Sequence, residues 1–348
     1  MSDTKLIIGM PAGSLADPTR GGSLITLLRN AGFPTKGYDQ GGPTSFPLHG
    51  FLVGWDGRPQ EFGTQLALGE VDIAISGDDW MRERTLEMQI EYGRSIELSK
   101  VLPLQRGAVR IVVIKNDDGE NDCDAWLKRL LSQKKLITVV SEMPYLALEW
   151  FRNKCAALGF ATSHKAYSIQ KFTTPPKNDS GIVIYETWGK TEAKVKNGAA
   201  DFGVEITQSG SSIRNYGLKI ADTIMNSEAG VWANPNLKKT PEKYALAQLV
   251  LLNLYGSIYA EDKVLVFFNA PKEEVPRMLE YLEKNKLFGT EPTMNAGEKY
   301  VEFSVELRTY DPNLPIARVR FELAKLGATA IETVPLESSI PSLDAIAF

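Results

Sequence analysis

The residues best suited to chemistry form a loop rich in hydroxyl groups between positions 204 and 214. An apolar run typical of a strand leads into the loop, and a short helix is predicted to follow. Backbone N–H groups and hydroxyls would then point at one spot, which suits an anionic phosphate. A Ser- and Gly-rich turn without a ligand has the same composition, so both interpretations stay open. The phosphate-binding candidates are Thr207, Gln208, Ser209, Gly210, Ser211 and Ser212.

A carboxylate stands at the start of the same loop. Glu205 stands two residues before Thr207 and would lie near any phosphate held there. Its oxygens could accept ribose hydroxyls, or hold Mg²⁺ through water. Glu205 is therefore a candidate for binding the sugar of a phosphorylated ligand.

A second group of candidates lies earlier in the chain. Gly77, Asp78 and Asp79 directly follow an apolar run at residues 71–76. Such residues would lie beyond the C-terminal end of a strand, where open α/β sheets bind ligands. Arg58 could clamp a pyrophosphate. The ordinary alternatives are Asp79 as the N-cap of a helix and Arg58 as a surface residue.

The elements that would position these residues follow from hydrophobic periodicity. The first two-thirds of the chain alternate short apolar runs with helical patterns, which predicts an α/β architecture. Helices are predicted to end at Gly32 and Gly159, and a Pro- and Asn-rich surface loop at 173–181. The charged segment 186–194 is typical of a solvated helix face. Strands are predicted at residues 6–10, 71–76, 108–115, 137–141 and 199–206.

The pattern changes after residues 234–241, a stretch with prolines and lysines that is predicted to be an inter-domain linker. Beyond a helix predicted at 241–259, two amphipathic helices and four strands follow in the order βαββαβ, including a weak strand at 290–294. Residues 301–307 alternate apolar and polar side chains, as a half-buried antiparallel strand does. We therefore expect a ferredoxin-like domain at the C-terminal end.

Composition bounds the class of protein. A length of 348 residues suits two or three domains, and 43% hydrophobic with 24% charged residues is typical of globular proteins. The net charge of −4 argues against nucleic acid or an anionic membrane as the main partner. The longest apolar stretch, 244–260, contains Gln248 and Asn253, and it fits a buried helix better than a bilayer span.

Cysteine and histidine usage limits the chemistry further. Cys123 and Cys155 are the only cysteines and lack a CxxC spacing, which predicts free thiols in a reducing compartment. With only two histidines as well, neither a zinc site nor a Cys/His nucleophile pair is expected. The first residues lack the pattern of a secretory signal, so we expect a cytoplasmic protein.

Several short segments, taken in order, resemble landmarks of the ATP phosphoribosyltransferase family. The resemblance runs over essentially the whole chain, and the C-terminal βαββαβ segment is similar to the regulatory domain of the family's long form. No single segment is specific for the family, but the order and spacing of the segments together are specific for it. The segments are residues 10–15, 58–61, 77–80, 188–194, 204–218 and 227–235.

This resemblance implies two catalytic lobes similar to type II periplasmic binding proteins, followed by an ACT-like domain. Lobe I would comprise residues 1–107 and 216–238, and lobe II residues 108–215 with the phosphate loop. The C-terminal regulatory or assembly domain would comprise residues 241–348. Histidine is implied as a feedback effector, in a homo-oligomer that is a dimer or a hexamer.

The resemblance also implies a reaction, the transfer of phosphoribose from 5-phosphoribosyl pyrophosphate to N1 of ATP in the first step of histidine biosynthesis. Mg²⁺ would enter with the pyrophosphate and have no direct protein ligand. Glu205 would hold the ribose hydroxyls, residues 209–212 the 5-phosphate, and Arg58 would lie towards the pyrophosphate. The nucleotide cleft would be lined by Ala12, Gly13, Ser14, Gly77, Asp78 and Asp79.

The sequence departs from the family pattern at two places. The family usually has Lys-Gly-Arg-Leu where residues 12–15 read Ala-Gly-Ser-Leu, and Thr-Arg-Arg where residues 147–149 read Ala-Leu-Glu. Arg20 or Lys190 could supply the missing positive charge. Two alternatives therefore stay open, a transferase that uses another base or amine, and a non-catalytic cytosolic protein that binds a ligand or regulates.

Overall fold

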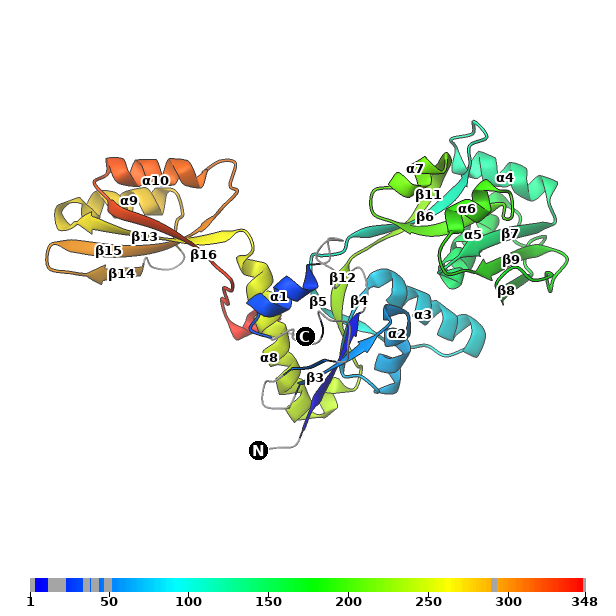
Figure 1. Ribbon diagram of the computed structural model, residues 1–348, viewed down its shortest axis with the longest axis horizontal. Coiled ribbons are helices and arrows are strands. Elements are labelled where there is room, and N and C mark those ends of the chain that lie inside the picture. The colour runs from blue at the N-terminus through cyan, green and yellow to red at the C-terminus, as the bar shows by residue number, and fades with distance from the viewer. Residues whose placement is uncertain are drawn as a thin grey trace. The chain divides into compact units, whose positions relative to one another are not determined.

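The computed structural model describes residues 4–11, 23–33, 38, 44–46, 52–288 and 293–346. The chain divides into two compact units, residues 1–25 with 35–247 and residues 26–34 with 248–348. The first unit contains two separate six-stranded sheets, each covered by helices, so it has two lobes (Figure 1). The α/β class predicted from the alternating patterns is confirmed.

The sheet of the first lobe has the strand order β2-β3-β1-β4-β12-β5. Strand β1 runs parallel to β3 and β4, whereas β12 runs antiparallel to β4 and β5. Helices α2 and α3 follow β3 and β4, so both begin at the C-terminal edge of the parallel strands. The elements are β1 Leu6–Pro11, β2 Thr44–Phe46, β3 Leu52–Gly57, α2 Pro59–Leu68, β4 Ile73–Gly77, α3 Asp78–Tyr92, β5 Ser99–Pro103 and β12 Ala229–Ala233.

The sheet of the second lobe has the order β11-β6-β10-β7-β9-β8. Helices α4 and α5 pack on one face through Trp126 and Phe151, and α6 and α7 pack on the other through Val195 and Ile213. The elements are β6 Val109–Asn116, α4 Cys123–Gln133, β7 Leu136–Ser141, α5 Pro144–Leu158, β8 Tyr167–Lys171, β9 Gly181–Glu186, α6 Thr191–Lys196, β10 Phe202–Thr207, α7 Ser211–Asn215 and β11 Leu218–Ser227.

The chain crosses between these sheets twice, after β5 and at Glu228 between β11 and β12. Strand β11 pairs antiparallel with β6 from Leu218 to Ser227. The expectation that residues 216–238 belong to the first lobe is therefore wrong for residues 218–227. The chain returns to the first sheet only after β11 has completed its pairing with β6.

The two lobes also meet where α3 packs against α5. Trp80 and Leu86 of α3 join the apolar core of the second lobe. The buried carboxylate of Glu83 accepts hydrogen bonds from the backbone N–H groups of Tyr145, at 2.9 Å, and Leu146, at 2.8 Å. A side chain of the first lobe thus caps a helix of the second lobe.

The second unit contains a four-stranded antiparallel sheet with the order β14-β15-β13-β16. Helices α9 and α10 cover one face, where Met278 and Leu323 pack on Phe268 and Phe303. The βαββαβ order predicted from the sequence is confirmed. The elements are β13 Lys263–Pro271, α9 Val275–Lys284, β14 Thr293–Ala296, β15 Tyr300–Arg308, α10 Ile316–Lys325 and β16 Thr329–Pro335.

The remaining helices include α1, Leu24–Asn30, and α8, Pro241–Ala260, which contains the boundary between the units at residues 247 and 248. Short 3₁₀ turns lie at Leu237–Lys239, Lys272–Glu274 and Leu343–Ile346. Helix α8 has 20 residues and buries Leu251 and Leu254. In the described ranges, no helix has the length and apolar character that a membrane span requires.

Candidate functional site

The loop between β10 and α7 is shaped by its own hydroxyl groups. The backbone N–H of Gly210 donates to Thr207 Oγ1 at 2.9 Å, and Ser209 Oγ donates to Ser211 Oγ at 3.0 Å. Gly210 has a φ of +72°, a left-handed conformation that favours glycine. The hydroxyls of Ser209, Ser211 and Ser212 lie on exposed residues at the C-terminal end of β10. The segment predicted as a phosphate loop is therefore a compact turn with three exposed serines, and Thr207 and Gly210 are buried within it.

Glu205 lies at the start of this loop, and its side chain is largely enclosed. Its Oε1 accepts a hydrogen bond from the backbone N–H of Ile206 at 3.0 Å. Burial and, to a smaller extent, the nearby carboxylates of Glu192 and Glu142 together raise the pKa of this carboxyl to about 7. Glu205 can therefore change charge near neutral pH.

Loops after neighbouring strands meet this one at the same edge of the sheet. Ser212 Oγ donates to Glu192 Oε1 at 2.6 Å, which ties the phosphate loop to α6. The backbone N–H of Gly189 donates to Glu142 Oε1 at 2.6 Å, which ties the loop after β9 to the loop after β7. The strand ends thus form one continuous polar surface, the position where open α/β sheets bind ligands.

Arg58 precedes the first turn of α2 in the first lobe. Its Cζ lies 5.4 Å from the ring centroid of Trp188, in the loop after β9 of the second lobe. Trp188 is 54% exposed, so the guanidinium covers part of a ring that is otherwise open. Arg58 therefore reaches the second lobe, where it contacts Trp188.

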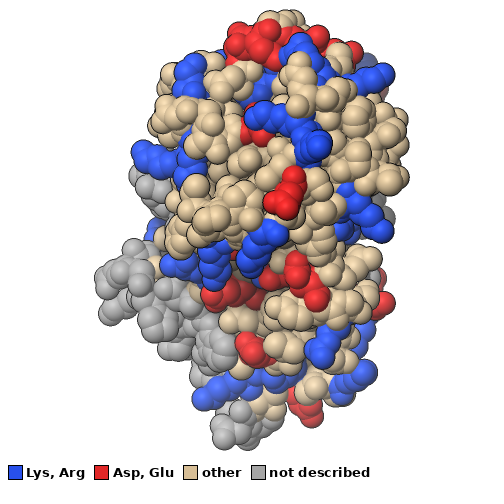
Figure 2. Space-filling model, turned by 90° about the vertical axis from the view of Figure 1, so that its right-hand side faces the viewer, with Lys and Arg blue, Asp and Glu red and all other residues tan. Residues whose placement is uncertain are grey.

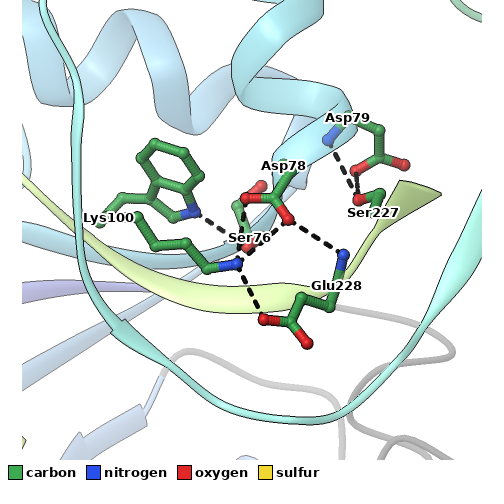
Figure 3. A network of polar contacts seen from close by, with 7 residues as sticks. Ser76, Asp78, Asp79, Lys100, Ser227 and Glu228 are labelled. Atoms are coloured by element: carbon green, nitrogen blue, oxygen red, sulfur yellow. Dashed lines mark hydrogen bonds and ion pairs between the residues drawn. The ribbon is translucent and has the colours of Figure 1, made fainter. Parts of the chain in front are cut away.

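The turn at the start of α3 is held by the network in Figure 3. Lys100 Nζ lies 3.0 Å from Asp78 Oδ1 and 3.3 Å from Glu228 Oε1, and the backbone N–H of Glu228 donates to Asp78 Oδ2. Ser227 donates to Asp79 Oδ1 at 2.9 Å, and burial raises the pKa of Asp79. These two carboxylates bind the α3 turn to the crossing between the lobes.

The ordinary alternative for Asp79, the N-cap of a helix, is wrong. Gly77 occupies the N-cap position of α3 with an extended backbone, and Asp79 lies inside the first turn. Its carboxylate is directed to Ser227, a contact between residues far apart in the sequence.

A pocket of about 520 Å³ connects the two groups of candidates. It is lined by Asp78 of the first lobe, Gln208 of the phosphate loop, and residues from both crossing segments, including Arg110, Ser227 and Glu228. On the face shown in Figure 2, Lys and Arg side chains gather in a band across the middle, with acidic side chains below it. The chain as a whole is acidic, so this positive charge is a local feature.

Two arginines beside the loop were not identified from the sequence. Arg214 lies in α7, and its guanidinium donates to the carbonyl oxygen of Ser209 at 2.9 Å. Arg110 lies on β6, directly opposite Thr207 of β10. Arg214 belongs to the segment 204–214, but the sequence does not show that its guanidinium turns back to the loop. Arg110 is far from the loop in sequence, and only the pairing of β6 with β10 makes it a neighbour of Thr207.

The positions that depart from the family pattern have different locations. Ala12, Gly13, Ser14 and Arg20 lie outside the described residues. In α5, Ala147 and Leu148 are fully buried in the core, and Glu149 pairs with Arg82 of α3. In the described part of the chain, no three His, Cys, Asp or Glu side chains are grouped to hold a metal ion.

Comparison with known proteins gives matches over nearly the whole chain. The family model HisG, described as ATP phosphoribosyltransferase, matches residues 58–254. The ATP phosphoribosyltransferase of Trichlorobacter lovleyi is 28% identical over 342 residues, which is 97% of this chain and 99% of the relative. ATP phosphoribosyltransferase 1 of Geobacter sulfurreducens is 26% identical over 343 residues, with 96% and 99% covered. Among solved structures, the ATP phosphoribosyl transferase (HisG:HisZ) complex from Thermotoga maritima has a TM-score of 0.48 at 17% identity, covering 72% of this chain and 98% of that one.

Proposed function

The chain belongs to the ATP phosphoribosyltransferase family, and from that premise we propose that it transfers the phosphoribosyl group of 5-phosphoribosyl pyrophosphate to N1 of ATP. This is the first step of histidine biosynthesis. The observation that carries the proposal is the accessible hydroxyl loop after β10 with the enclosed carboxylate of Glu205 at its start. A phosphate site and a sugar-hydroxyl acceptor are adjacent there, as a phosphoribosyl substrate requires.

In this reaction the adenine N1 attacks C1′ of the ribose, the N–C bond forms, and the bond from C1′ to the pyrophosphate oxygen breaks. The chemistry needs little acid–base help, so orientation and charge neutralisation dominate. The loop from Thr207 to Ser212 would hold the 5-phosphate. Ionised Glu205 would accept hydrogen bonds from the ribose hydroxyls and fix the sugar for attack.

The first lobe would supply the other side of the cleft. Arg58 would neutralise the pyrophosphate once its guanidinium leaves the Trp188 ring, a contact that is weak enough to exchange. The turn of Gly77, Asp78 and Asp79 would line the nucleotide side. The pocket shared by Asp78 and Gln208 supports this placement.

Mg²⁺ would reach this site bound to the pyrophosphate. The carboxylates of Glu192 and Glu142 lie close enough to raise the pKa of Glu205, and such oxygen donors suit the water shell of Mg²⁺. When bound, the ion would offset negative charge on the leaving group. The residues present therefore fit a substrate-borne metal ion.

We extend the proposal to the architecture and its regulation. The two lobes would close over substrates as type II periplasmic binding proteins do. Residues 241–348 would form an ACT-like, ferredoxin-type domain that binds histidine as feedback inhibitor and assembles dimers into a hexamer. The βαββαβ connectivity supports the domain type. The free thiols of Cys123 and Cys155 suit work in the cytoplasm.

The test is release of pyrophosphate from 5-phosphoribosyl pyrophosphate and Mg²⁺, with and without ATP. We expect ATP-dependent release together with a new absorbance from the N1-substituted adenine. Release that requires a different base, or no release at all, would contradict the proposed acceptor or the proposed catalysis, respectively.

A matched pair of variants locates the reaction at the loop. Gly210→Asp places a carboxylate in the loop, and we expect it to abolish turnover. Gly159→Asp is the control because Gly159 has a similar left-handed φ of +84° at the end of α5, with open space around it. Equal activity in both variants would exclude the loop as the phosphate site.

A further inference from the structure

Two guanidinium groups converge on the backbone of Gly210. A Cβ atom at this glycine would lie 3.1 Å from Arg214 Nη1 and 3.9 Å from Arg110 Nη2. Arg110 is opposite Thr207 in the β6–β10 pair, and antiparallel partners point to the same face of a sheet. The register therefore brings a β6 arginine to the loop, and α7 brings a second one.

Neither charge is neutralised by the protein in the described part of the chain. Arg214 donates one hydrogen bond to the carbonyl oxygen of Ser209, and Arg110 lines the pocket beside Gln208. A guanidinium carries five N–H donors, so most of theirs stay available. By contrast, Arg82 pairs with Glu149 and Arg129 pairs with Asp118. Two like charges at one turn repel each other, and an anion between them would remove that repulsion.

Carboxylates lie beside the same loop. Glu205 shares the sheet face of Thr207 and Arg110, but it stands two residues before Thr207 along β10, opposite Val112. Glu192 accepts the hydroxyl of Ser212. The loop thus has arginines near Gly210, and it has carboxylates at Glu205 and at Glu192, the partner of Ser212. A sugar phosphate would match this arrangement with its phosphate at the arginines and its hydroxyls at the carboxylates.

We propose that Arg110 and Arg214 bind the 5-phosphate of the phosphoribosyl substrate and set the direction in which the sugar enters the site. This rests on the proposed function and adds to it the residues that supply the positive charge.

The experiment is calorimetric titration of the full-length protein with ribose 5-phosphate, which isolates the phosphate and the sugar from the rest of the reaction. Arg110→Gln and Arg214→Gln should each weaken binding by about 10- to 100-fold, because each removes a charged hydrogen-bond donor. Arg152→Gln is the control: it removes the same charge from the same lobe, but Arg152 stacks on Tyr167. Arg214→Lys should bind with intermediate affinity, since it keeps the charge and loses the planar fork.

The outcomes separate this inference from the proposed function. Unchanged ribose 5-phosphate affinity in both glutamine variants would overturn the inference, even if the wild type releases pyrophosphate with ATP. Weakened binding in both, with Arg152→Gln unaffected, would support it, even if ATP proves not to be the acceptor. Equal weakening in all three variants would assign the effect to overall charge and would also overturn the inference. Thermal melting of each variant checks that the fold is intact.

Discussion

Glu205 combines two requirements that oppose each other. Its carboxylate must be ionised to accept ribose hydroxyls, whereas its burial and the nearby Glu192 favour the neutral form. A pKa of about 7 means that both forms are populated at neutral pH. The charge state of one residue should therefore control substrate affinity in the physiological range.

We predict that affinity for 5-phosphoribosyl pyrophosphate falls as pH decreases through about 7, by up to about tenfold per pH unit. Only the ionised carboxylate accepts both hydroxyls, and below its pKa of about 7 that form becomes scarce. Glu205→Gln should bind more weakly at pH 8 and lose this part of the pH dependence. The measurement is calorimetric titration between about pH 5.5 and pH 8.5. The phosphates of the ligand also titrate in this pH range, and they do so equally for the wild type and for Glu205→Gln. The role of Glu205 is therefore read from the difference between the two affinity–pH profiles, and parallel profiles would refute it.

The residues of the site were predictable to different degrees. Thr207 to Ser212 and Glu205 are contiguous, so their polar character was visible in the sequence. Arg110 was not recognisable, because only the pairing of β6 with β10 brings it to the loop. Arg58 was identified as a candidate, but its contact with Trp188 depends on how the two lobes meet. The polar character of a contiguous segment can be predicted from the sequence. Which distant side chains meet that segment depends on the pairing register of the strands and on how the lobes pack.

At the scale of elements, the contact between α3 and α5 contains one buried carboxylate, that of Glu83. Burial raises the pKa of Glu83 to about 7, despite two backbone hydrogen bonds that lower it. Arg84 lowers this pKa and Glu186 raises it, and both are smaller effects than burial. The ordinary value is 4.5, so the folded protein binds this proton more tightly than the unfolded chain does.

The sign of the pH effect follows from that difference. The contribution of Glu83 to stability is fully present below about pH 4.5 and is lost as pH rises through about 7. A raised pKa of this size corresponds to a free energy on the order of 3 kcal/mol. We therefore predict that the free energy of unfolding has a component that decreases between about pH 4.5 and 7. Glu205 adds a component of the same sign.

Glu83→Gln is the variant that tests this, by denaturant unfolding across the same pH range. It should be less stable than the wild type at all pH values, because an amide oxygen and an NH₂ group cannot satisfy both N–H donors of α5. Its stability should also depend less on pH. Glu91→Gln, on an exposed position of the same helix, should keep the wild-type profile. A Glu83→Gln profile parallel to that of the wild type would refute the assignment.

Secondary structure was predictable where apolar runs were long or strictly periodic. Strands β6, β7 and β10 are largely buried apolar runs, and β15 alternates between buried and more exposed residues, so each was expected near its observed position. Strands β8 and β12 were not predicted, because they are short and contain Gln or Gly in place of a continuous apolar pattern. The prediction that residues 218–227 belong to the first lobe was wrong, because a strand's own sequence does not indicate which of two sheets it joins.

At the scale of the whole molecule, helices α9 and α10 cover one face of the C-terminal sheet, and among the described residues no helix packs in the apolar cluster from the other face. Val266 and Phe268 of β13 are buried under α9 and α10, while Leu265 and Phe267 alternate with them and are only half-buried. Val334 of the edge strand β16 lies directly opposite Leu265 and is 47% exposed. Glu332 shares this outer face with Val334. The unpaired backbone groups of an edge strand favour pairing with another chain, and we place the assembly contact of the proposed oligomer at this edge.

We predict that Val334→Asp lowers the mass of the particle measured by light scattering, because a charge in an apolar contact is costly to bury. Phe321→Asp is the control, since Phe321 is a larger and more exposed apolar side chain, 62% exposed, on the helical face. It should leave the mass unchanged. Binding of ribose 5-phosphate, which uses the other unit, should stay normal in both variants. A wild-type mass for Val334→Asp, or a reduced mass for Phe321→Asp, would place the assembly contact elsewhere. A change in the mass of the wild-type particle on adding histidine would show that the effector acts on assembly.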